Sequence, residues 1–181
     1  VLKRYHDAAK KYKADIIIRI TSDCPFVDPK IIDKLINTLI EKKLDYASNT
    51  IKPTYPDGLD AEVFTFKALQ EAQKKAKSKY DKEHVTPYIK KNKKFKKFNL
   101  EYKTDVSSFR LTVDEKRDIE LVEFAFKNFN SKIGWEKIIK SKNIKKIFFS
   151  KNNTLQRDEG ASMPLGQKMW LRAKNIIPGG T

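Results

Sequence analysis

The feature that most constrains the fold is a short run of β-branched residues, 15–20, between two helix-like segments. Four isoleucines in six positions are typical of a strand buried on both faces, as in parallel sheets. The run ends abruptly at residues 21–25, and Asp28 and Pro29 then supply the cap and first turn of a helix. We therefore expect a buried parallel strand, a turn and a helix, which form the basic unit of a layered α/β domain.

The same alternation continues along the chain. Apolar residues recur at helical spacing in some segments and in short runs bounded by Gly, Pro or Asn in others. The predicted helices are 1–13, the segment after Pro29, 67–76, a piece around 83–90, 118–126 and 135–140; the predicted strands are 46–48, 61–66, 98–102 and 109–113.

Composition sets the class of protein. With 181 residues, 39% of them hydrophobic, the chain is long enough for one α/β domain with a filled core. No apolar stretch approaches the ~20 residues of a membrane helix, and no signal peptide is visible. Cys24, the only cysteine, excludes an internal disulfide and favours a cytoplasmic location. Its position after the strand favours a small buried side chain over a thiol nucleophile.

The net charge of +16 raises the question of whether the protein binds nucleic acid. The excess is nearly all Lys, with six Arg, and the densest run is 90–97. This run is either a phosphate-contacting patch or a solvated helix end. We favour the second interpretation, an exposed run without specific nucleic-acid binding, because Lys lacks the bidentate fork that reads bases.

Carboxylates follow two of the predicted strands. Asp23 comes after the first strand and Asp114 after 109–113, and ligands bind at the carboxyl edge of open α/β sheets. Two such carboxylates brought to one edge could share a hard cation such as Mg²⁺. Each is also well placed as a helix cap or turn residue. The acidic loop 57–62 could receive sugar hydroxyls or serve turn chemistry, and His84 could touch a ligand or be structural.

Four segments together resemble signatures of cytidylyltransferases of the spore-coat polysaccharide type, which are similar to the acylneuraminate and ketodeoxyoctonate cytidylyltransferases. The segments are 19–29, 55–63, 83–88 and 110–118, in the family's order. The resemblance implies a three-layer α/β/α sandwich on a mixed, mostly parallel sheet. It also implies a nucleotidyltransferase that transfers CMP from CTP to a sugar or sugar acid, with release of pyrophosphate, in surface polysaccharide biosynthesis; the expected partners are CTP and an acidic sugar, and dimers are common in the family.

The resemblance assigns roles to individual residues. Asp23 and Asp114 match the aspartates that hold the catalytic Mg²⁺. The substrate-binding residues that it implies are Arg19, Asp60, Glu62, His84 and Arg110.

The chain departs from the family pattern at its N-terminal end. The basic loop that wraps the triphosphate has no match, and the sequence opens with Val1 inside a helix-like segment, so we expect an N-terminally cut chain without CTP turnover of its own. Residues 170–181 resemble the start of glutamate-1-semialdehyde-type aminotransferases. We therefore expect a cytidylyltransferase-like domain at 1–149, a linker at 150–164 and the start of a second domain at 165–181. The alternatives are a non-catalytic basic nucleotide-binding or nucleic-acid-binding module, and a fusion whose main activity is a pyridoxal-phosphate aminotransferase.

Overall fold

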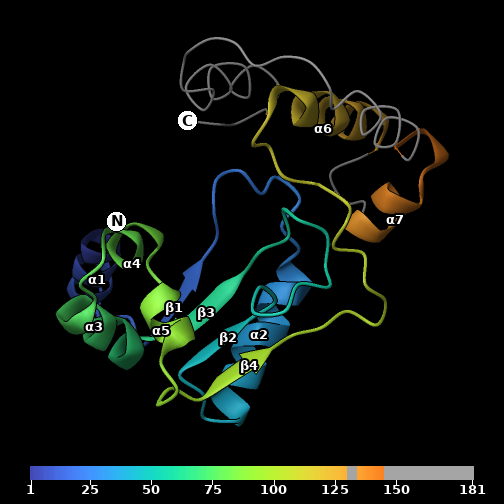
Figure 1. The fold of residues 1–181 in the computed structure, drawn as a ribbon. Helices are drawn as coiled ribbons and strands as arrows, with labels where there is room; N and C mark the ends of the chain where they lie inside the picture. The colour runs from blue at the N-terminus through green and yellow to red at the C-terminus, as the bar shows by residue number, and fades with distance from the viewer. Residues whose placement is uncertain (130–133, 145–181) are drawn as a thin grey trace.

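The computed structural model describes residues 1–129 and 134–144, and strands and helices alternate along it (Figure 1). Most boundaries lie within a few residues of those predicted. The elements are α1 (Leu2–Lys11), β1 (Ile16–Arg19), α2 (Pro29–Glu41), β2 (Tyr46–Ser48), β3 (Glu62–Thr65), α3 (Phe66–Lys75), α4 (Lys79–His84), α5 (Pro87–Lys91), β4 (Lys97–Asn99), α6 (Lys116–Asn128) and α7 (Trp135–Lys140).

The four strands form one open sheet in the order β1-β3-β2-β4. β3 runs antiparallel to both β1 and β2, and β2 runs parallel to β4. The mixed sheet is therefore confirmed, but within the described residues it is not mostly parallel, and β1 pairs antiparallel with β3. The reason is the excursion at 49–61, which returns the chain into β3 in the opposite direction. β1 consequently lies at an edge of the described sheet.

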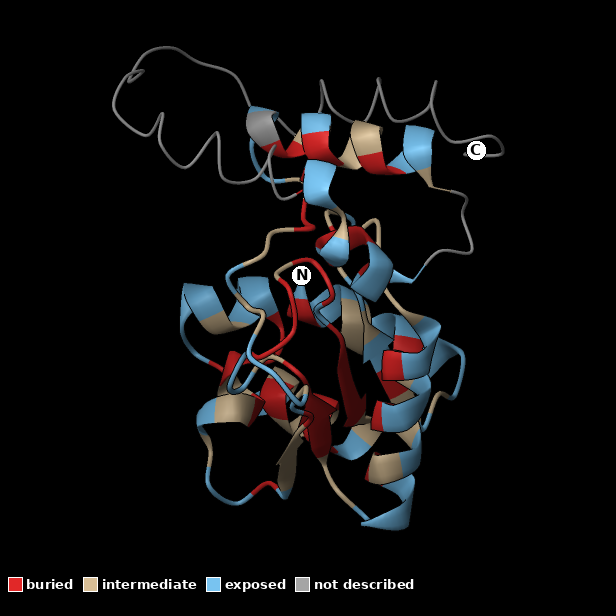
Figure 2. Ribbon diagram, turned by 90° about the vertical axis from the view of Figure 1, so that its right-hand side faces the viewer, coloured by how far each residue is buried: buried red, intermediate tan, exposed pale blue. Residues whose placement is uncertain are grey.

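The sheet separates two apolar clusters, which gives the expected three layers. Neighbouring residues of β3 face opposite ways: Val63 belongs to a cluster with α2, α6 and α7, whereas Phe64 belongs to one with α1 and α3. Figure 2 shows the buried strands at the centre and the exposed outer faces of the helices. In Figure 1, α6 and α7 lie beyond one end of the sheet. The layered α/β fold is confirmed.

Two predicted elements differ in the structure. The helical piece at 83–90 is split into α4 and α5, because Val85 adopts a left-handed φ of 71° with its side chain fully buried. The strand predicted at 109–113 was wrong: the segment makes only an isolated bridge, between Asp57 and Arg110. The Leu111 and Val113 amides donate hydrogen bonds to the loop carbonyls of Asp57 and Asp23, and not to a neighbouring strand.

The sequence also predicts how the C-terminal part of the chain is divided and that no helix spans a membrane. The linker at 150–164 and the second domain at 165–181 lie outside the described residues. Among residues 1–129 and 134–144, no helix has both the length and the apolar character needed to cross a bilayer.

The cap of α2 provides a test of the local structure. The Asp28 carboxylate accepts a hydrogen bond from the Lys30 amide at 2.9 Å, and Pro29 occupies the first turn. Asp28→Ala should lower the free energy of unfolding by about 1 kcal/mol, measured by urea denaturation, because it removes this cap. Asp33→Ala, on the exposed face of the same helix, should stay within about 0.5 kcal/mol of the parent. Equal losses in the two variants would contradict the capping role.

Candidate active site

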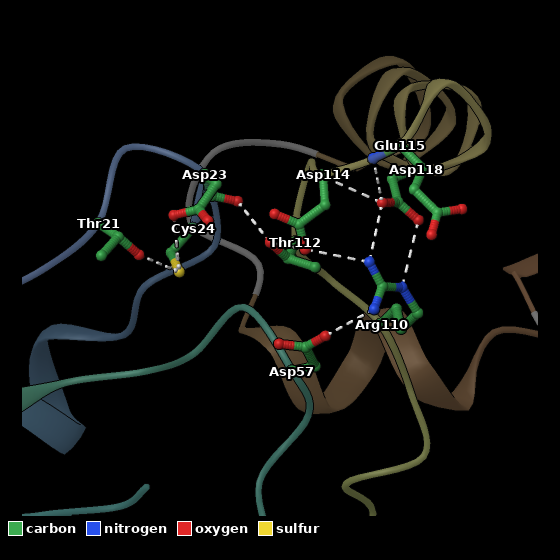
Figure 3. A network of polar contacts seen from close by, with 9 residues as sticks. All are labelled: Thr21, Asp23, Cys24, Asp57, Arg110, Thr112, Asp114, Glu115 and Asp118. Atoms are coloured by element: carbon green, nitrogen blue, oxygen red, sulfur yellow. Dashed lines mark hydrogen bonds and ion pairs between the residues drawn. The ribbon is translucent and has the colours of Figure 1, made fainter. Parts of the chain in front are cut away.

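Three segments far apart in the sequence meet beyond the end of β1, as Figure 3 shows. The loop at 20–28 follows β1, the loop at 52–59 precedes β3, and the segment at 109–115 leads into α6. The Val113 amide donates to the Asp23 carbonyl at 2.9 Å, and the Leu111 amide donates to the Asp57 carbonyl at 2.7 Å. Backbone hydrogen bonds therefore hold the segment at 109–115 against both loops.

This arrangement brings Asp23 and Asp114 to one place. The Thr112 hydroxyl lies 3.1 Å from the Asp23 carbonyl oxygen and 3.3 Å from Asp114 Oδ2 (Figure 3). The two aspartates were expected to follow neighbouring strands of the sheet. Instead, the contact runs through loop backbone and one threonine, although the two residues are 91 positions apart in the sequence.

Arg110 lies at the centre of the acidic cluster. Its guanidinium contacts Asp57 Oδ2 at 2.9 Å, Asp114 Oδ2 at 3.1 Å and Asp118 Oδ2 at 3.1 Å (Figure 3). The hydrogen bonds to Asp118 are the largest cause that raises the pKa of Arg110 further above its ordinary value. The sequence implied that Arg110 binds substrate. In the structure its guanidinium is engaged by three carboxylates, and it offsets their mutual repulsion.

Asp118 is a site residue to which the sequence assigned no role. It is only 6% exposed and accepts hydrogen bonds from the backbone amides of Asp114 and Glu115, at 3.1 and 2.9 Å. It occupies the third position of α6 in a capping box, so the signal available in the sequence was that of a helix start. In the structure the same carboxylate holds both Arg110 and the backbone of Asp114.

The donor chemistry of the cluster fits a magnesium ion. Asp23 and Asp114 each carry a carboxylate oxygen with no partner among the described residues. Among those residues no group of three or more His, Cys, Asp or Glu is arranged for a metal. Mg²⁺ nevertheless binds through one or two carboxylates, with substrate phosphates and water completing its octahedron. Three carboxylates contact the single guanidinium of Arg110, so the cluster carries excess negative charge when they are ionised. The pKa of Asp57 is raised by burial, and the charges of Asp114, Asp118 and Asp23 add to this against the effect of Arg110.

A small polar pocket of about 80 Å³ lies at the end of β1. It brings together Arg19, Asp60 and Glu62, three of the residues that the family resemblance implied. It does not include His84, whose exposed ring packs on Tyr80 with the ring centroids 4.4 Å apart. The full lining is Arg19, Thr21, Thr50, Asp60, Glu62 and Lys90.

Glu62 is the centre of this pocket and only 3% exposed. Its Oε1 accepts from Tyr46 at 2.6 Å, from Thr86 at 2.7 Å and from Lys90 at 2.7 Å, and its Oε2 accepts from Arg19 at 2.7 Å. Burial alone would raise the pKa of Glu62, but the charge of Lys90 and these hydrogen bonds lower it below its ordinary value. Glu62 is therefore an ionised, fully paired carboxylate.

Lys90 is a site residue that sequence reasoning missed. The run 90–97 was expected to be an exposed charged segment, and residues 91, 93, 94 and 96 are exposed. The Lys90 ammonium instead lines the pocket and contacts both Glu62 and Thr50. The available signal was its spacing from Thr86, since residues four apart on a helix share a face.

Much of the remaining lysine run is held by contacts within the protein. Lys91 lies 3.9 Å from Asp81, Lys94 pairs with Glu71, and the half-buried Lys97 donates to two carbonyl oxygens. These contacts leave less free charge for phosphate than the sequence run indicates. The absence of specific nucleic-acid binding stays a prediction.

Asp60 gives the pocket a pH dependence that can be measured. Although the residue is exposed overall, partial burial of its carboxyl raises its pKa to about 6, with added repulsion from Asp57 and Glu62 and opposition from Lys90. Because the folded pKa lies above the ordinary value of 3.8, this group favours folding below about pH 4 and loses that contribution as the pH rises through 6. Asp60→Asn should therefore raise the melting temperature relative to the parent at pH 7.5 but not at pH 4.

The control for this experiment is Asp105→Asn. Ser107 lowers the pKa of the exposed Asp105 through hydrogen bonds, so this substitution should act in the opposite direction, with its loss of stability at neutral rather than acid pH. An Asp60→Asn effect of equal size at both pH values would show that its carboxyl titrates normally.

Two curated proteins resemble the chain in sequence. The chain is 43% identical over 135 residues to the uncharacterized protein MJ1063 of Methanocaldococcus jannaschii, covering 72% of this chain and 54% of that protein. It is 30% identical over 127 residues to the spore coat polysaccharide biosynthesis protein SpsF of Bacillus subtilis, covering 68% of this chain and 52% of that protein. The chain thus spans about half the length of these curated relatives.

A solved structure shares the fold. The cytidylyltransferase from Leptospira borgpetersenii serovar Hardjo-bovis superposes with a TM-score of 0.74 at 30% identity, over 90% of this chain and 67% of that one. The sequence profile described as cytidylyltransferase matches residues 1–159. The chain therefore belongs to the cytidylyltransferase family.

Proposed function

We propose that the protein transfers CMP from CTP to a sugar or sugar acid, with release of pyrophosphate, as a cytoplasmic enzyme of surface polysaccharide biosynthesis. Family membership supports a nucleotidyltransferase that uses CTP, and the similarity to SpsF suggests the pathway. The observation that carries the proposal is the meeting of Asp23 and Asp114 at Thr112, beside a polar pocket that suits a hydroxylated substrate.

The residues of the acidic cluster around Arg110 would act mainly by holding a metal ion and, through it, the phosphates of the nucleotide. Asp23 and Asp114 would hold Mg²⁺, which when bound neutralises phosphate oxygens as charge develops. Asp118 holds the Asp114 backbone, and Arg110 keeps the Asp114 carboxylate in place. Such an arrangement restricts the orientation of the phosphates, which is the main requirement for in-line transfer.

The acceptor would enter from the neighbouring pocket. Asp57 and Asp60 stand on the same loop, so one short segment links the acidic cluster to the pocket. Asp60 remains exposed at the pocket, whereas Glu62 is enclosed. We therefore assign acceptor contact to Asp60 and Arg19.

The test is pyrophosphate release from CTP with Mg²⁺ and a panel of neutral and acidic sugars. The assay should use both the 181-residue chain and the longest open reading frame that contains it. The product of that open reading frame should release pyrophosphate in an acceptor-dependent way. If it releases none with CTP but does so with another nucleotide, the proposed nucleotide is wrong, and release with none of the four nucleotides would reject the reaction.

A further inference from the structure

The polar pocket beside β1 is lined by two cations and two carboxylates. Arg19 and Lys90 oppose Glu62 and Asp60, so the lining is neutral overall when both acids are ionised. The volume of about 80 Å³ is well below the ~300–1,000 Å³ of pockets that enclose a whole drug-sized ligand. The pocket therefore suits one part of a substrate.

The hydrogen bonds already made show which groups can still receive a ligand. Glu62 accepts from four side chains and is only 3% exposed, so its buried carboxylate is closed to substrate by burial and by its existing partners. The Lys90 ammonium has three protons and uses two, toward Glu62 and Thr50 at 2.7 and 3.1 Å. Arg19 uses only Nη1 among the described residues. Each cation thus retains donor capacity.

Asp60 supplies the complementary acceptor. Asp60 lines the same pocket, and its carboxylate makes no side-chain hydrogen bond within residues 1–129 and 134–144. A carboxylate from a ligand would meet the charge of Asp60 and leave the pocket with one excess negative charge. A hydroxyl group would accept from a cation, donate to Asp60 and keep the pocket neutral.

We propose that this pocket binds a neutral hydroxyl of the acceptor, which accepts a hydrogen bond from Lys90 and donates one to Asp60, with Glu62 as the residue that positions Lys90. This assignment rests on the proposed function for the identity of the ligand as an acceptor sugar. It changes the role of Glu62 from substrate contact to positioning, and it adds Lys90 to the binding residues. It also places any carboxylate of an acidic sugar outside this pocket.

The test compares two sugars that differ mainly in one carboxylate. Galactose and galacturonate are titrated separately into the ¹⁵N-labelled chain at pH 7.5, without CTP or metal, and amide shifts near Thr21, Thr50 and Asp60 are followed. Both sugars should shift these amides with dissociation constants within about threefold of each other. Lys90→Met should weaken both by about tenfold, since a hydrogen bond to a charged group is lost.

The matched control is Lys91→Met on the same helix. Lys91 is largely exposed and lies 3.9 Å from Asp81, so its replacement should leave both dissociation constants unchanged. Glu62→Gln should weaken both sugars as Lys90→Met does. In a Lys90→Met background the same substitution should weaken binding no further, as expected of a residue that acts through Lys90, whereas a purely structural role of Glu62 would add a second loss. Lys90→Arg, which keeps a donor, should recover part of the affinity.

The outcomes separate this inference from the proposed reaction. Binding of galacturonate alone, binding of neither sugar, or unchanged binding in Lys90→Met would each overturn the inference. None of these results depends on CTP or Mg²⁺. Conversely, sugar binding at Lys90 together with no pyrophosphate release from any nucleotide would support the pocket and reject the proposed reaction.

Discussion

Asp114→Ala should abolish pyrophosphate release, by roughly a thousandfold or more, in the longest active product of the open reading frame. The substitution removes one of two carboxylates proposed to hold Mg²⁺, and a metal ion supplies several kcal/mol of transition-state stabilisation in such reactions. Asp23→Ala should have an effect of the same order. The measurement is phosphate production in a coupled pyrophosphatase assay with CTP and the best acceptor of the sugar panel.

A second readout separates loss of metal from loss of structure. Binding of Mn²⁺, followed by water proton relaxation, should weaken at least tenfold in both variants, while far-ultraviolet circular dichroism stays unchanged. Asp105→Ala, nine residues before Asp114, exposed and hydrogen-bonded among the described residues to Ser107, is the matched control and should retain activity and Mn²⁺ affinity. If Asp114→Ala remains fully active, its carboxylate serves only as a partner of Arg110.

Gly58→Ala should destabilise the protein by about 3 kcal/mol or more. Gly58 has a φ of 99°, a conformation that side chains rarely adopt. A Cβ atom at this position would lie 2.4 Å from the Leu111 carbonyl carbon and 2.4 Å from the Thr112 amide nitrogen. Both contacts are with backbone atoms, so the steric overlap can be relieved only if the loop at 52–59 moves away from the segment at 109–115. The cost of this movement adds to the cost of the unfavourable φ. The measurement is the free energy of unfolding in urea.

The control for this position is Gly134→Ala. Gly134 precedes α7 with an ordinary φ of −70°, and apart from its chain neighbours no atom of the described residues lies within 4 Å of an added Cβ. Because Gly134 is the N-cap of α7, where Gly is preferred over Ala, its replacement should cost no more than about 1 kcal/mol. Gly58→Ala should also weaken Mn²⁺ binding, because the loop that carries Asp57 and the segment that carries Asp114 are held together at this point. A Gly58 variant as stable as the parent would show that the two backbones move apart at little cost.

Local chemistry explains why most elements could be predicted. The cap at Asp28, the helix at Trp135–Lys140 and the strand at Tyr46–Ser48 depend on residues close in sequence, and the structure has them as expected. The strand predicted at 109–113 was wrong because an apolar run indicates that the segment is buried but does not specify which part of the chain covers it. This run is buried against two loops instead of a sheet neighbour.

The edge strand β1 shows the same limit. The isoleucines of the run 15–20 are typical of a strand buried on both faces, yet Ile18 in β1 and Ile20 just after it are 42% and 38% exposed. In the described chain β1 has one neighbour, β3. Composition therefore predicted a strand, while the pairing and its direction depended on where a loop of about a dozen residues returned the chain.

The residues of the candidate site can likewise be divided into those predicted from local sequence and those found in the structure alone. The sequence by itself determined that Asp23, Asp60 and Asp114 stand beside turns or element ends, because those positions follow from local patterns. The pairing of Arg110 with Asp57, and that of Lys90 with Glu62, became visible in the tertiary structure alone. The physical reason is that charge pairing depends on distances of a few ångströms between residues tens of positions apart, which no local pattern specifies.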